Sequence, residues 1–432
     1  MVTLMAKSIR SPWFELAADY PTDIKLGLPV GETEQSGKLE NIVNLFEDRF
    51  DQLHKVLRQE MGFKRTSTIK EIRKNRTAFR HRECNVIGIV ANSRRTKSGG
   101  KMIELEDKTG TLSVFVRKED PAAATILHDD VIGVTGNFSE SGDMFFVSRV
   151  QFPEFLDTQN KGGEEYDPIS IAFASDIHIG SKYFLEKEWF DMLDWLQSDH
   201  HVAQNIKYLV LSGDVVDGIG VYPGQDQNLN ITDVYDQYEF CARSLDLLPE
   251  HITPIILPGN HDAVRPAEPQ PVLEPLIQQK FNSTVHVGNP CRMELSGIDV
   301  LSYHGKGIDD MVPRMKNVTY EAPAEAMKEM LKKRHLAPMW GERNALSPEE
   351  EDQMTIIKKP DIFVTGHTHA HQQEWYRGTQ LIVSSTWQGQ SDFMRMLGYK
   401  PKMGYLSVYN IQNRESKTIQ FVDQDNPSAG VE

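Results

Sequence analysis

The spacing of hydrophobic residues changes along the chain and predicts different kinds of structure in different regions. Over residues 39–61, apolar side chains recur every three to four positions, which is the spacing of one face of a helix. This pattern predicts an amphipathic helix whose apolar face needs a partner surface. The partner is either the core of the same chain or the surface of another subunit.

Over residues 83–156 the apolar residues occur instead in short β-prone runs, separated by glycine-containing turns. The five runs are residues 86–91, 102–106, 111–116, 131–135 and 144–150. Five strands with a longer segment between the third and the fourth are typical of a small barrel of the OB type. A structural barrel that contacts other proteins and a barrel that binds nucleic acid are both compatible with this pattern.

From residue 167 onwards, β-prone runs alternate with helical stretches at residues 186–197, 235–248 and 324–334. Such alternation indicates a layered α/β domain. The sequence therefore predicts a multidomain α/β (α+β) protein with an N-terminal OB-fold β-barrel. The expected parts are an irregular lead-in (1–37), a helical and basic segment (38–82), the OB-fold domain (83–156), the layered α/β domain (167–423) and a disordered tail (424–432).

Composition restricts the class of protein. A length of 432 residues is more than one hydrophobic core usually serves, and no apolar run is long enough to span a bilayer. The N-terminus lacks the apolar stretch of a secretory signal, so a cytoplasmic protein without a membrane partner is expected. The three cysteines lie far apart and form no C-x-x-C pair, which favours reduced core thiols over metal ligands.

The charge distribution gives a mixed indication about nucleic acid. A net charge of −15 argues against a chain that coats nucleic acid with its whole surface. Nine basic residues between Arg58 and Arg82 form either a solvated face or a strip that contacts phosphates. The first hairpin loop of the predicted barrel carries the candidate DNA-binding residues Arg94, Arg95, Lys97 and Lys101. No cluster of exposed aromatic residues accompanies them to stack bases, which leaves a protein-contacting barrel open.

Five short polar clusters in the second half of the chain carry the candidate chemistry, and each follows a β-prone run. They are Asp176-Ile-His178, Gly213-Asp214-Val-Val-Asp217, Gly259-Asn260-His261-Asp262, Tyr303-His304-Gly305 and Gly366-His367-Thr-His369. Polar groups at successive strand ends converge on one rim of an α/β sheet, where such folds place their ligands. A D-x-H or an H-x-H alone is more often an ordinary pair, but five clusters in this order indicate a binuclear metal-dependent phosphoesterase.

A pair of divalent metals about 3.5–4 Å apart can activate water and neutralise the charge on a phosphodiester. Such a pair needs a bridging carboxylate. We expect Asp214 to be the bridge, because the preceding Gly213 lets the backbone turn sharply at its strand end. Four imidazoles together with carboxylate and amide oxygens suit Mn²⁺, Fe²⁺ or Zn²⁺ better than Mg²⁺, and Mn²⁺ is the metal we expect.

The five motifs together resemble the signature of calcineurin-like metallophosphoesterases. The resemblance implies two sets of ligands: Asp176, His178, Asp214 and His369 for one metal, and Asp214, Asn260, His304 and His367 for the other. It implies that His261 is no ligand but a catalytic residue that protonates the leaving oxygen or stabilises the transition state, oriented by Asp262. Repair nucleases of this superfamily have a histidine where Asp217 stands here, so its role stays open, with support of a neighbouring ligand favoured. His371 is expected to be structural or on the surface.

The barrel directly before the phosphoesterase domain resembles the small subunits of replicative DNA polymerases. Residues 41–57, 333–341 and 361–369 resemble archaeal family D polymerase small subunits in particular, and the resemblance covers residues 40–423. Eukaryotic counterparts have lost metal ligands, whereas this chain retains all of them. The resemblance implies a 3′→5′ exonuclease that proofreads for a separate large catalytic subunit in a two-subunit polymerase.

The partners implied are that large subunit, the 3′ end of a DNA primer-template and, as a further candidate, the sliding clamp. The location implied is the cytoplasm of an archaeal cell, in association with the nucleoid. Two alternatives belong to other classes. One is a scaffold subunit whose site is a relic, which the complete ligand set argues against. The other is a free-standing metallophosphoesterase, which accounts for neither the barrel nor the amphipathic helix at residues 39–57.

Overall fold

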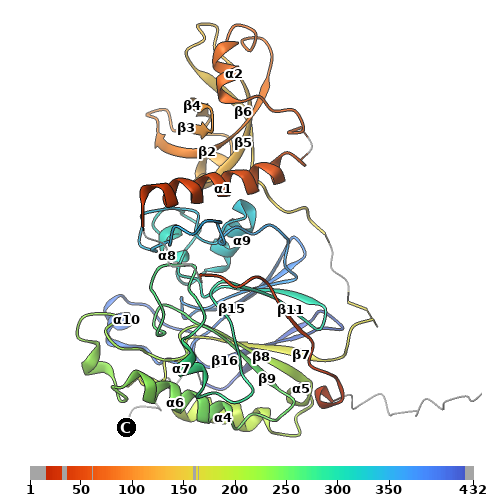
Figure 1. Ribbon diagram of the computed structural model, residues 1–432, viewed down its shortest axis with the longest axis vertical. Helices are drawn as coiled ribbons and strands as arrows, with labels where there is room; N and C mark the ends of the chain where they lie inside the picture. Colours follow the sequence, from red (N-terminus) through yellow and green to blue (C-terminus); the bar gives the residue numbers. More distant parts are fainter. Residues whose placement is uncertain (1–15, 32–36, 61, 159–161, 164, 424–432) are drawn as a thin grey trace, which may run out of the picture.

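The computed structural model describes residues 16–31, 37–60, 62–158, 162–163 and 165–423. The tail at residues 424–432, expected to be disordered, lies outside the described residues, as do residues 1–15 of the expected lead-in. Figure 1 shows a small barrel at one end of the molecule, a larger layered body at the other, and helix α1 between them. The predicted multidomain α/β (α+β) fold is confirmed.

Five strands close the barrel, as the five β-prone runs predict, and their order is β2-β3-β4-β6-β5. They are β2 (Cys84–Arg95), β3 (Lys101–Asp107), β4 (Gly110–Val116), β5 (Val131–Phe138) and β6 (Phe145–Gln151). The short helix α3 (Ala122–Thr125) occupies the long connection between β4 and β5. Helix α2 (Ile69–Lys74) begins at a capping box, in which Thr68 and Glu71 each accept a hydrogen bond from the other's backbone N–H.

The amphipathic helix predicted at residues 39–61 is α1 (Leu39–Leu57). Its residues Leu53 and Leu57 pack against the barrel, while Arg49 points the other way and donates a hydrogen bond to Asp352 of the large domain. Of the two partner surfaces considered, the core of the same chain is therefore the one that the helix covers. Further apolar residues of α1 line a shallow cleft of about 370 Å³ beside the barrel.

The large domain is built on two stacked six-stranded sheets. One sheet has the order β10-β9-β8-β7-β16-β17, with β10 (Val285–His286), β9 (Thr253–Leu257), β8 (Ile206–Ser212), β7 (Ser170–Ala174), β16 (Tyr405–Asn410) and β17 (Ser416–Gln420). The other has the order β1-β11-β12-β13-β15-β14, with β1 (Ile24–Leu26), β11 (Cys291–Leu295), β12 (Ile298–Ser302), β13 (Ile362–Thr365), β15 (Thr379–Ser384) and β14 (His371–Tyr376).

Three hydrophobic clusters define the layers of this domain. One cluster lies between the sheets and joins side chains of β7, β8 and β9 to side chains of β11, β12 and β13. A second packs α4 (Glu186–Leu196) and α6 (Val234–Leu245) on the outside of the first sheet, and a third packs α8 (Ile308–Met311) and α9 (Ala324–Lys333) near the second (Figure 1). The smaller elements are α5 (His201–Gln204), α7 (Pro275–Gln278), α10 (Asp392–Met396) and the 3₁₀ turns η1 (Ala17–Asp19) and η2 (Gln225–Asn228).

Part of the irregular or partly ordered lead-in predicted at residues 1–37 forms a turn and a short strand. Strand β1 pairs antiparallel with β11 and places Ile24 opposite Leu295. The turn η1 is fixed to the other sheet, because the Lys207 ammonium donates to the carbonyl oxygens of Ala17 and Tyr20 at 3.3 and 2.7 Å. A strand of three residues is too short to give a periodic pattern, so the sequence does not reveal it.

The barrel and the large domain are joined by buried charges as well as by α1. The Lys333 ammonium donates to Asp130 of the barrel at 2.6 Å, and both side chains are almost fully buried. The neighbouring Arg334 guanidinium stacks over the Phe155 ring at 3.7 Å. Because an unpaired charge at such a depth is costly, these contacts fix the two parts against one another.

All three cysteines are buried free thiols, as the sequence predicts. None of the helices in the described part of the chain is both long enough and apolar enough to cross a membrane.

Candidate metal centre

The candidate metal ligands all lie at strand ends, and they come from both sheets. Asp176, Asp214 and Asn260 follow β7, β8 and β9, which run parallel in one sheet. His304 and the pair His367 and His369 follow β12 and β13, which run parallel in the other. The carboxyl ends of the strands in both sheets open on the same side, and the ligands meet there.

The backbone at this site is unusually strained. Five of the seven candidate ligands have positive φ angles: Asp176 (52°), His178 (54°), Asp214 (52°), His367 (65°) and His369 (53°). This left-handed region is uncommon for residues other than glycine, and such positions cluster at functional sites. Gly213 has a φ of 97°, and a Cβ atom there would lie 2.4 Å from Nδ1 of His304, so the glycine before Asp214 serves close packing as well as the turn.

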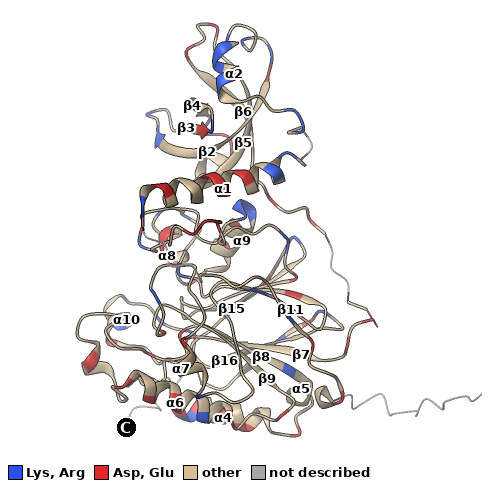
Figure 2. Cartoon of the chain, in the orientation of Figure 1, with Lys and Arg blue, Asp and Glu red and all other residues tan. Residues whose placement is uncertain are grey.

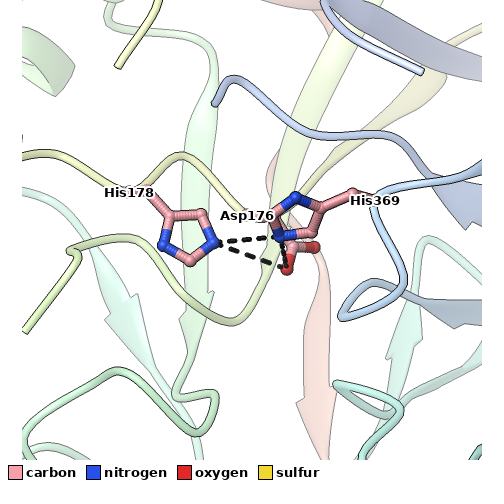
Figure 3. Close-up of side chains that lie close together, drawn as sticks. All are labelled: Asp176, His178 and His369. Carbon is pink, nitrogen blue, oxygen red and sulfur yellow. Dashed lines mark hydrogen bonds and ion pairs between the residues drawn. The ribbon is translucent and has the colours of Figure 1, made fainter. Parts of the chain in front are cut away.

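Asp176, His178 and His369 form the first group of ligand atoms (Figure 3). Oδ1 of Asp176 lies 3.3 Å from Nε2 of His369 and 3.9 Å from Nε2 of His178. The two Nε2 atoms face one another at 3.1 Å. Nδ1 of His178 meets the Asp217 carboxylate at 3.0 Å, which assigns the ring proton to Nδ1 and leaves the Nε2 lone pair pointing at the other ligands.

Asp176, Asp214 and His304 form a second group beside the first. Nε2 of His304 lies 3.2 Å from Oδ2 of Asp214 and 3.1 Å from Oδ1 of Asn260. Nδ1 of His304 donates to the carbonyl oxygen of Ser212 at 2.9 Å, so Nε2 is the free ligand atom in the neutral ring. Oδ2 of Asp214 is also 3.9 Å from Nε2 of His178. Asp176 is common to both groups, and Asp214 of the second group also approaches His178 of the first.

His367 lies next to the second group but reaches a residue that the sequence did not single out. Its ring centroid is 5.3 Å from that of His304, and its Nε2 lies 3.1 Å from Oδ1 of Asp309. Asp309 also accepts hydrogen bonds from Lys306 at 2.6 Å and Tyr320 at 3.0 Å. The available signal was weak: Asp309 belongs to an acidic pair at the start of α8, five residues after His304.

The electrostatics of the centre favour cations. Asp176 and Asp214 are 0% and 2% exposed, and within the described residues neither forms a salt bridge with lysine or arginine. Burial alone would raise the pKa of Asp214, but the neighbouring His304 and His261 hold it well below its usual value. The pKa of His304 is raised to about 10, because Asp214 and Asp176 outweigh the effect of burial. Two buried carboxylates among imidazole nitrogens and an amide oxygen form a donor set that fits divalent metal ions.

His261 is fixed beside the ligands without belonging to either of the two groups. Its backbone N–H donates to Oδ1 of Asp214 at 2.8 Å, and its Nδ1 lies 2.8 Å from the carbonyl oxygen of Asp217. Nδ1 of the neutral ring is therefore the donor, and Nε2 is left for a substrate. His261 and Asp217 also approach His178 in a third group of potential ligand atoms.

The predicted role of Asp262 is wrong. Its carboxylate does not orient the His261 ring, but accepts hydrogen bonds from the Gly259 N–H at 2.8 Å and the Tyr238 hydroxyl at 2.9 Å. Burial, together with the charge of Asp214, raises the pKa of Asp262 to about 7. Asp262 therefore closes the turn that carries Asn260 and His261 and ties it to α6.

The candidate DNA-binding residues differ in their surroundings. Arg94, Arg95 and Lys97 are exposed at the first hairpin of the barrel. Lys101 is not available in the same way, because its ammonium donates to the carbonyl oxygen of Ile126 at 2.5 Å and burial lowers its pKa. Figure 2 shows further basic residues on α2, at the end of the barrel remote from the large domain.

A family model that describes the B subunits of DNA polymerases alpha and epsilon matches residues 171–374, which include every candidate ligand. A relative from Archaeoglobus fulgidus, a DNA polymerase II small subunit, is 40% identical over 387 residues that cover 88% of this chain and 77% of that protein. The small subunit of Thermoplasma acidophilum is 34% identical and covers 91% and 80% of the two chains. The DNA polymerase II small subunit of Methanocaldococcus jannaschii is 38% identical, and the match covers 88% of this chain and 65% of that protein.

A solved structure described as a novel archaeal phosphodiesterase matches with a TM-score of 0.30 and 12% identity, and covers 58% of this chain and 99% of that one. That score is too low to support a conclusion about this chain. The sequence relatives, in contrast, extend over the barrel and the large domain alike. They show that this chain belongs to the family of archaeal DNA polymerase II small subunits.

Proposed function

We propose that the chain is a metal-dependent 3′→5′ exonuclease, the proofreading small subunit of a heteromeric DNA polymerase. The observation that carries this proposal is a pair of buried ligand groups that share Asp176. Asp214 of the second group approaches His178 of the first, and His261 lies beside them. The sheets supply seven candidate ligands at one edge, and within the described residues no lysine or arginine pairs with the two carboxylates.

The roles follow from which atoms are left free. Asp176, His178, Asp214 and His369 hold one divalent cation, and Asp214, Asn260, His304 and His367 hold the other. Bound there, the two cations supply activated water and positive charge for the phosphoryl oxygens. In its protonated form, His261 keeps Nδ1–H on the carbonyl oxygen of Asp217 and donates the Nε2 proton to the leaving 3′ oxygen, which leaves the ring neutral. Asp217 holds the His178 and His261 rings in the required tautomers.

The metal we propose is Mn²⁺, with Fe²⁺ and Zn²⁺ as alternatives. Four imidazole nitrogens make the donor set softer than the all-oxygen surroundings that Mg²⁺ prefers. Most of the imidazoles also stand on turns with a strained backbone, which fixes their positions. This favours Mn²⁺, which accepts nitrogen ligands, over Mg²⁺, which keeps most of its bound water.

The partners we propose are a large catalytic subunit and the 3′ end of a primer-template, with the sliding clamp as a further candidate. The relatives are named small subunits, which supports a larger partner. Exposed Arg94, Arg95 and Lys97 on the barrel are the candidate contacts to DNA phosphates, and binding through them weakens as salt increases.

The test is the hydrolysis of a single-stranded oligonucleotide and of a mismatched primer by the purified chain with Mn²⁺. We expect release of nucleoside 5′-monophosphates from the 3′ end. His261→Ala should lower kcat by about 10²–10⁴-fold, because the leaving oxygen loses its proton donor. Metal content and Tm should stay close to those of the unchanged protein, since His261 is not one of the seven proposed ligands.

His371→Ala is the matched control, because this imidazole lies two residues beyond His369 but stacks on Tyr405 away from the ligands. It should retain the exonuclease activity. Normal cleavage by His261→Ala would contradict the proposed mechanism. A purified chain that carries well under one metal ion per molecule and cuts no substrate would favour the scaffold alternative instead.

A further inference from the structure

The pocket beside His261 has two chemically different halves. It has a volume of about 540 Å³, within the range of small-ligand sites. One half is polar and contains Asn260, His261, Asp262 and Lys306. The other half is apolar and contains residues of the loop after β8 together with side chains that face it: Ile219, Val221, Val234, Ala263, Val264 and Pro266.

The loop after β8 exposes apolar side chains beside this pocket. Ile219 and Val221 line it and are 50% and 38% exposed, and the next residue, Tyr222, is 38% exposed. The Tyr222 ring lies edge-on to the His261 ring, with 6.5 Å between the centroids and 63° between the planes. Neighbouring exposed apolar residues beside a catalytic group indicate a ligand surface, because their contact with water contributes nothing to the fold.

Hydrogen bonds through Gln225 hold the loop after β8 against Asp217. The buried Gln225 side chain accepts a hydrogen bond from the Val221 N–H at 2.9 Å and donates to the carbonyl oxygen and the carboxylate of Asp217 at 2.8 and 2.9 Å. Gly218 has a φ of 71°, and a Cβ atom there would lie 2.1 Å from the carbonyl oxygen of His261. The apolar side chains thus keep a fixed position relative to the residue that orients His178 and His261.

We propose that this loop, with Tyr222 as the stacking residue, is the binding wall for the terminal nucleobase of a single-stranded 3′ end. The inference rests on the proposed exonuclease function and names the part of the substrate that the apolar half receives. A nucleotide combines a flat base, which stacks on aromatic and aliphatic side chains, with an anionic phosphate. The pocket combines an aliphatic wall, with the Tyr222 ring against His261 next to it, and polar imidazole, amide, carboxylate and ammonium groups.

Stacking accounts for two properties that proofreading requires. Every base has a π-face, so an aromatic wall accepts any terminal nucleotide. A base inside a duplex is already stacked and paired, so it reaches the wall only after it has left the helix, which costs least at a mismatch. Lys306 adds positive charge to the polar half, where its ammonium is held by Asp309 at 2.6 Å.

The test compares short oligonucleotides whose 3′-terminal nucleotide is either intact or abasic. Binding of 5′-labelled tetranucleotides to the full chain is measured by fluorescence anisotropy without metal, and hydrolysis is measured with Mn²⁺. We expect the unchanged protein to prefer the intact end by about tenfold in Kd and in kcat/KM. Tyr222→Ala should bring this ratio close to one, and Tyr222→Phe should restore it, because phenylalanine keeps the aromatic face.

Trp375→Ala is the control, since this aromatic residue is also exposed but lies on β14. It should leave the ratio unchanged. If Tyr222→Ala fails to fold, Ile219→Ser tests the same wall and should lower the ratio at least twofold. An unchanged ratio in folded Tyr222→Ala or in Ile219→Ser overturns the stacking wall. A base-dependent Kd without any Mn²⁺-dependent hydrolysis would instead support the wall and refute the exonuclease function.

Discussion

Asp217 and Asp309 each contact an imidazole of the candidate metal centre. Asp217 meets Nδ1 of His178 at 3.0 Å, and Asp309 meets Nε2 of His367 at 3.1 Å. A carboxylate in this position fixes the tautomer and the orientation of the ring, so that the opposite nitrogen faces the metal. The two carboxylates come from different connections, one after β8 and one at α8, and each contacts a histidine of a different proposed metal position.

Replacement of Asp309 tests this arrangement at the second position. We expect Asp309→Asn to weaken the second of two Mn²⁺ binding steps by about 10–100-fold and to leave the first step nearly unchanged, because only His367 loses its orienting partner. Isothermal titration of the metal-free chain with Mn²⁺ measures both steps. Asp246→Asn, on the exposed end of α6, is the control. Equal weakening of both steps would show that Asp309 does not act through His367.

For single residues, the sequence predicted the candidate metal ligands well but predicted poorly which side chains they and their neighbours contact. Polar residues directly after β-prone runs allowed the seven candidate ligands to be named, and the structure brings them together. The partners depend on which side chain faces which, and this follows from packing rather than from spacing. Asp262 faces Tyr238 instead of His261, Lys101 turns towards Ile126, and Asp309 arrives from a separate helix.

Helix α1 packs against the barrel with one face and contacts the large domain with the opposite face. Leu53 and Leu57 pack on the barrel, while Arg49, 1% exposed, donates to Asp352 at 2.6 Å. The His335 ring also meets the Asp352 carboxylate, at 2.9 Å. Burial alone would raise the pKa of Asp352, but Arg49 and His335 hold it below its usual value. One buried carboxylate thus joins α1 to the segment between β12 and β13.

Removal of this carboxylate should loosen α1. We expect Asp352→Ala to lower the free energy of unfolding by about 3–5 kcal/mol, because the Arg49 guanidinium stays buried without a counter-charge. The double variant Arg49→Met with Asp352→Leu should lose less than the single one, since no charge is then left unpaired. Guanidinium denaturation followed by circular dichroism measures both.

The exposed pair of Lys187 and Asp191 on α4 provides the comparison. Asp191→Ala should change the free energy of unfolding by less than about 1 kcal/mol, because solvent screens this pair. A similar small effect for Asp352→Ala would mean that the buried pair does not hold α1 in place.

Whole elements were easier to predict than their partners. The five barrel strands and the ligand-bearing strands of the large domain are long enough to appear as β-prone runs, and α1 shows a clear helical period. The pattern could not decide which surface α1 covers, because an amphipathic face has the same spacing whether it packs within a chain or against a second one. Strand β1, with three residues, depends on its partner β11 for its existence.

For the whole molecule, metal binding should add to stability. Bound cations interact with the folded centre and find no preformed site in the unfolded chain. At a free Mn²⁺ concentration of about 100 times Kd, we expect a gain of about 2.7 kcal/mol and a higher Tm than in EDTA. Asp214→Ala should abolish most of this gain, because Asp214 serves both proposed positions. Scanning calorimetry with and without Mn²⁺ measures it, and an equal gain in the variant would exclude this centre as the binding site.

Stability should also fall on the acidic side of neutrality because of His286. Its ring packs edge-on against Phe281, neither ring nitrogen has a hydrogen-bond partner within the described residues, and burial lowers its pKa to about 4. The unfolded chain takes up this proton near pH 6.5, so the contribution is complete above that pH. It is lost as the pH falls from 6.5 to about 4.

His286→Phe should therefore reduce the loss of unfolding free energy between pH 7 and pH 4.5 by about 2 kcal/mol relative to the unchanged chain. Urea denaturation at the two pH values measures the difference. His201→Phe, at an exposed position, should leave that loss as it is in the unchanged chain. The same loss in His286→Phe would assign the acid sensitivity to other groups.

The origin of the ligands in two separate sheets has a mechanical consequence. Asp176, His178, Asp214 and Asn260 belong to one layer, and His304, His367 and His369 belong to the other. Metal ions bound by both sets of ligands would therefore connect the two layers at the edge where the strands end. A descendant that lost the metal ligands would also lose these connections. New packing contacts between the two sheets would have to replace them. Loss of the proposed ligands and additional packing between the two sheets should then appear together in such chains.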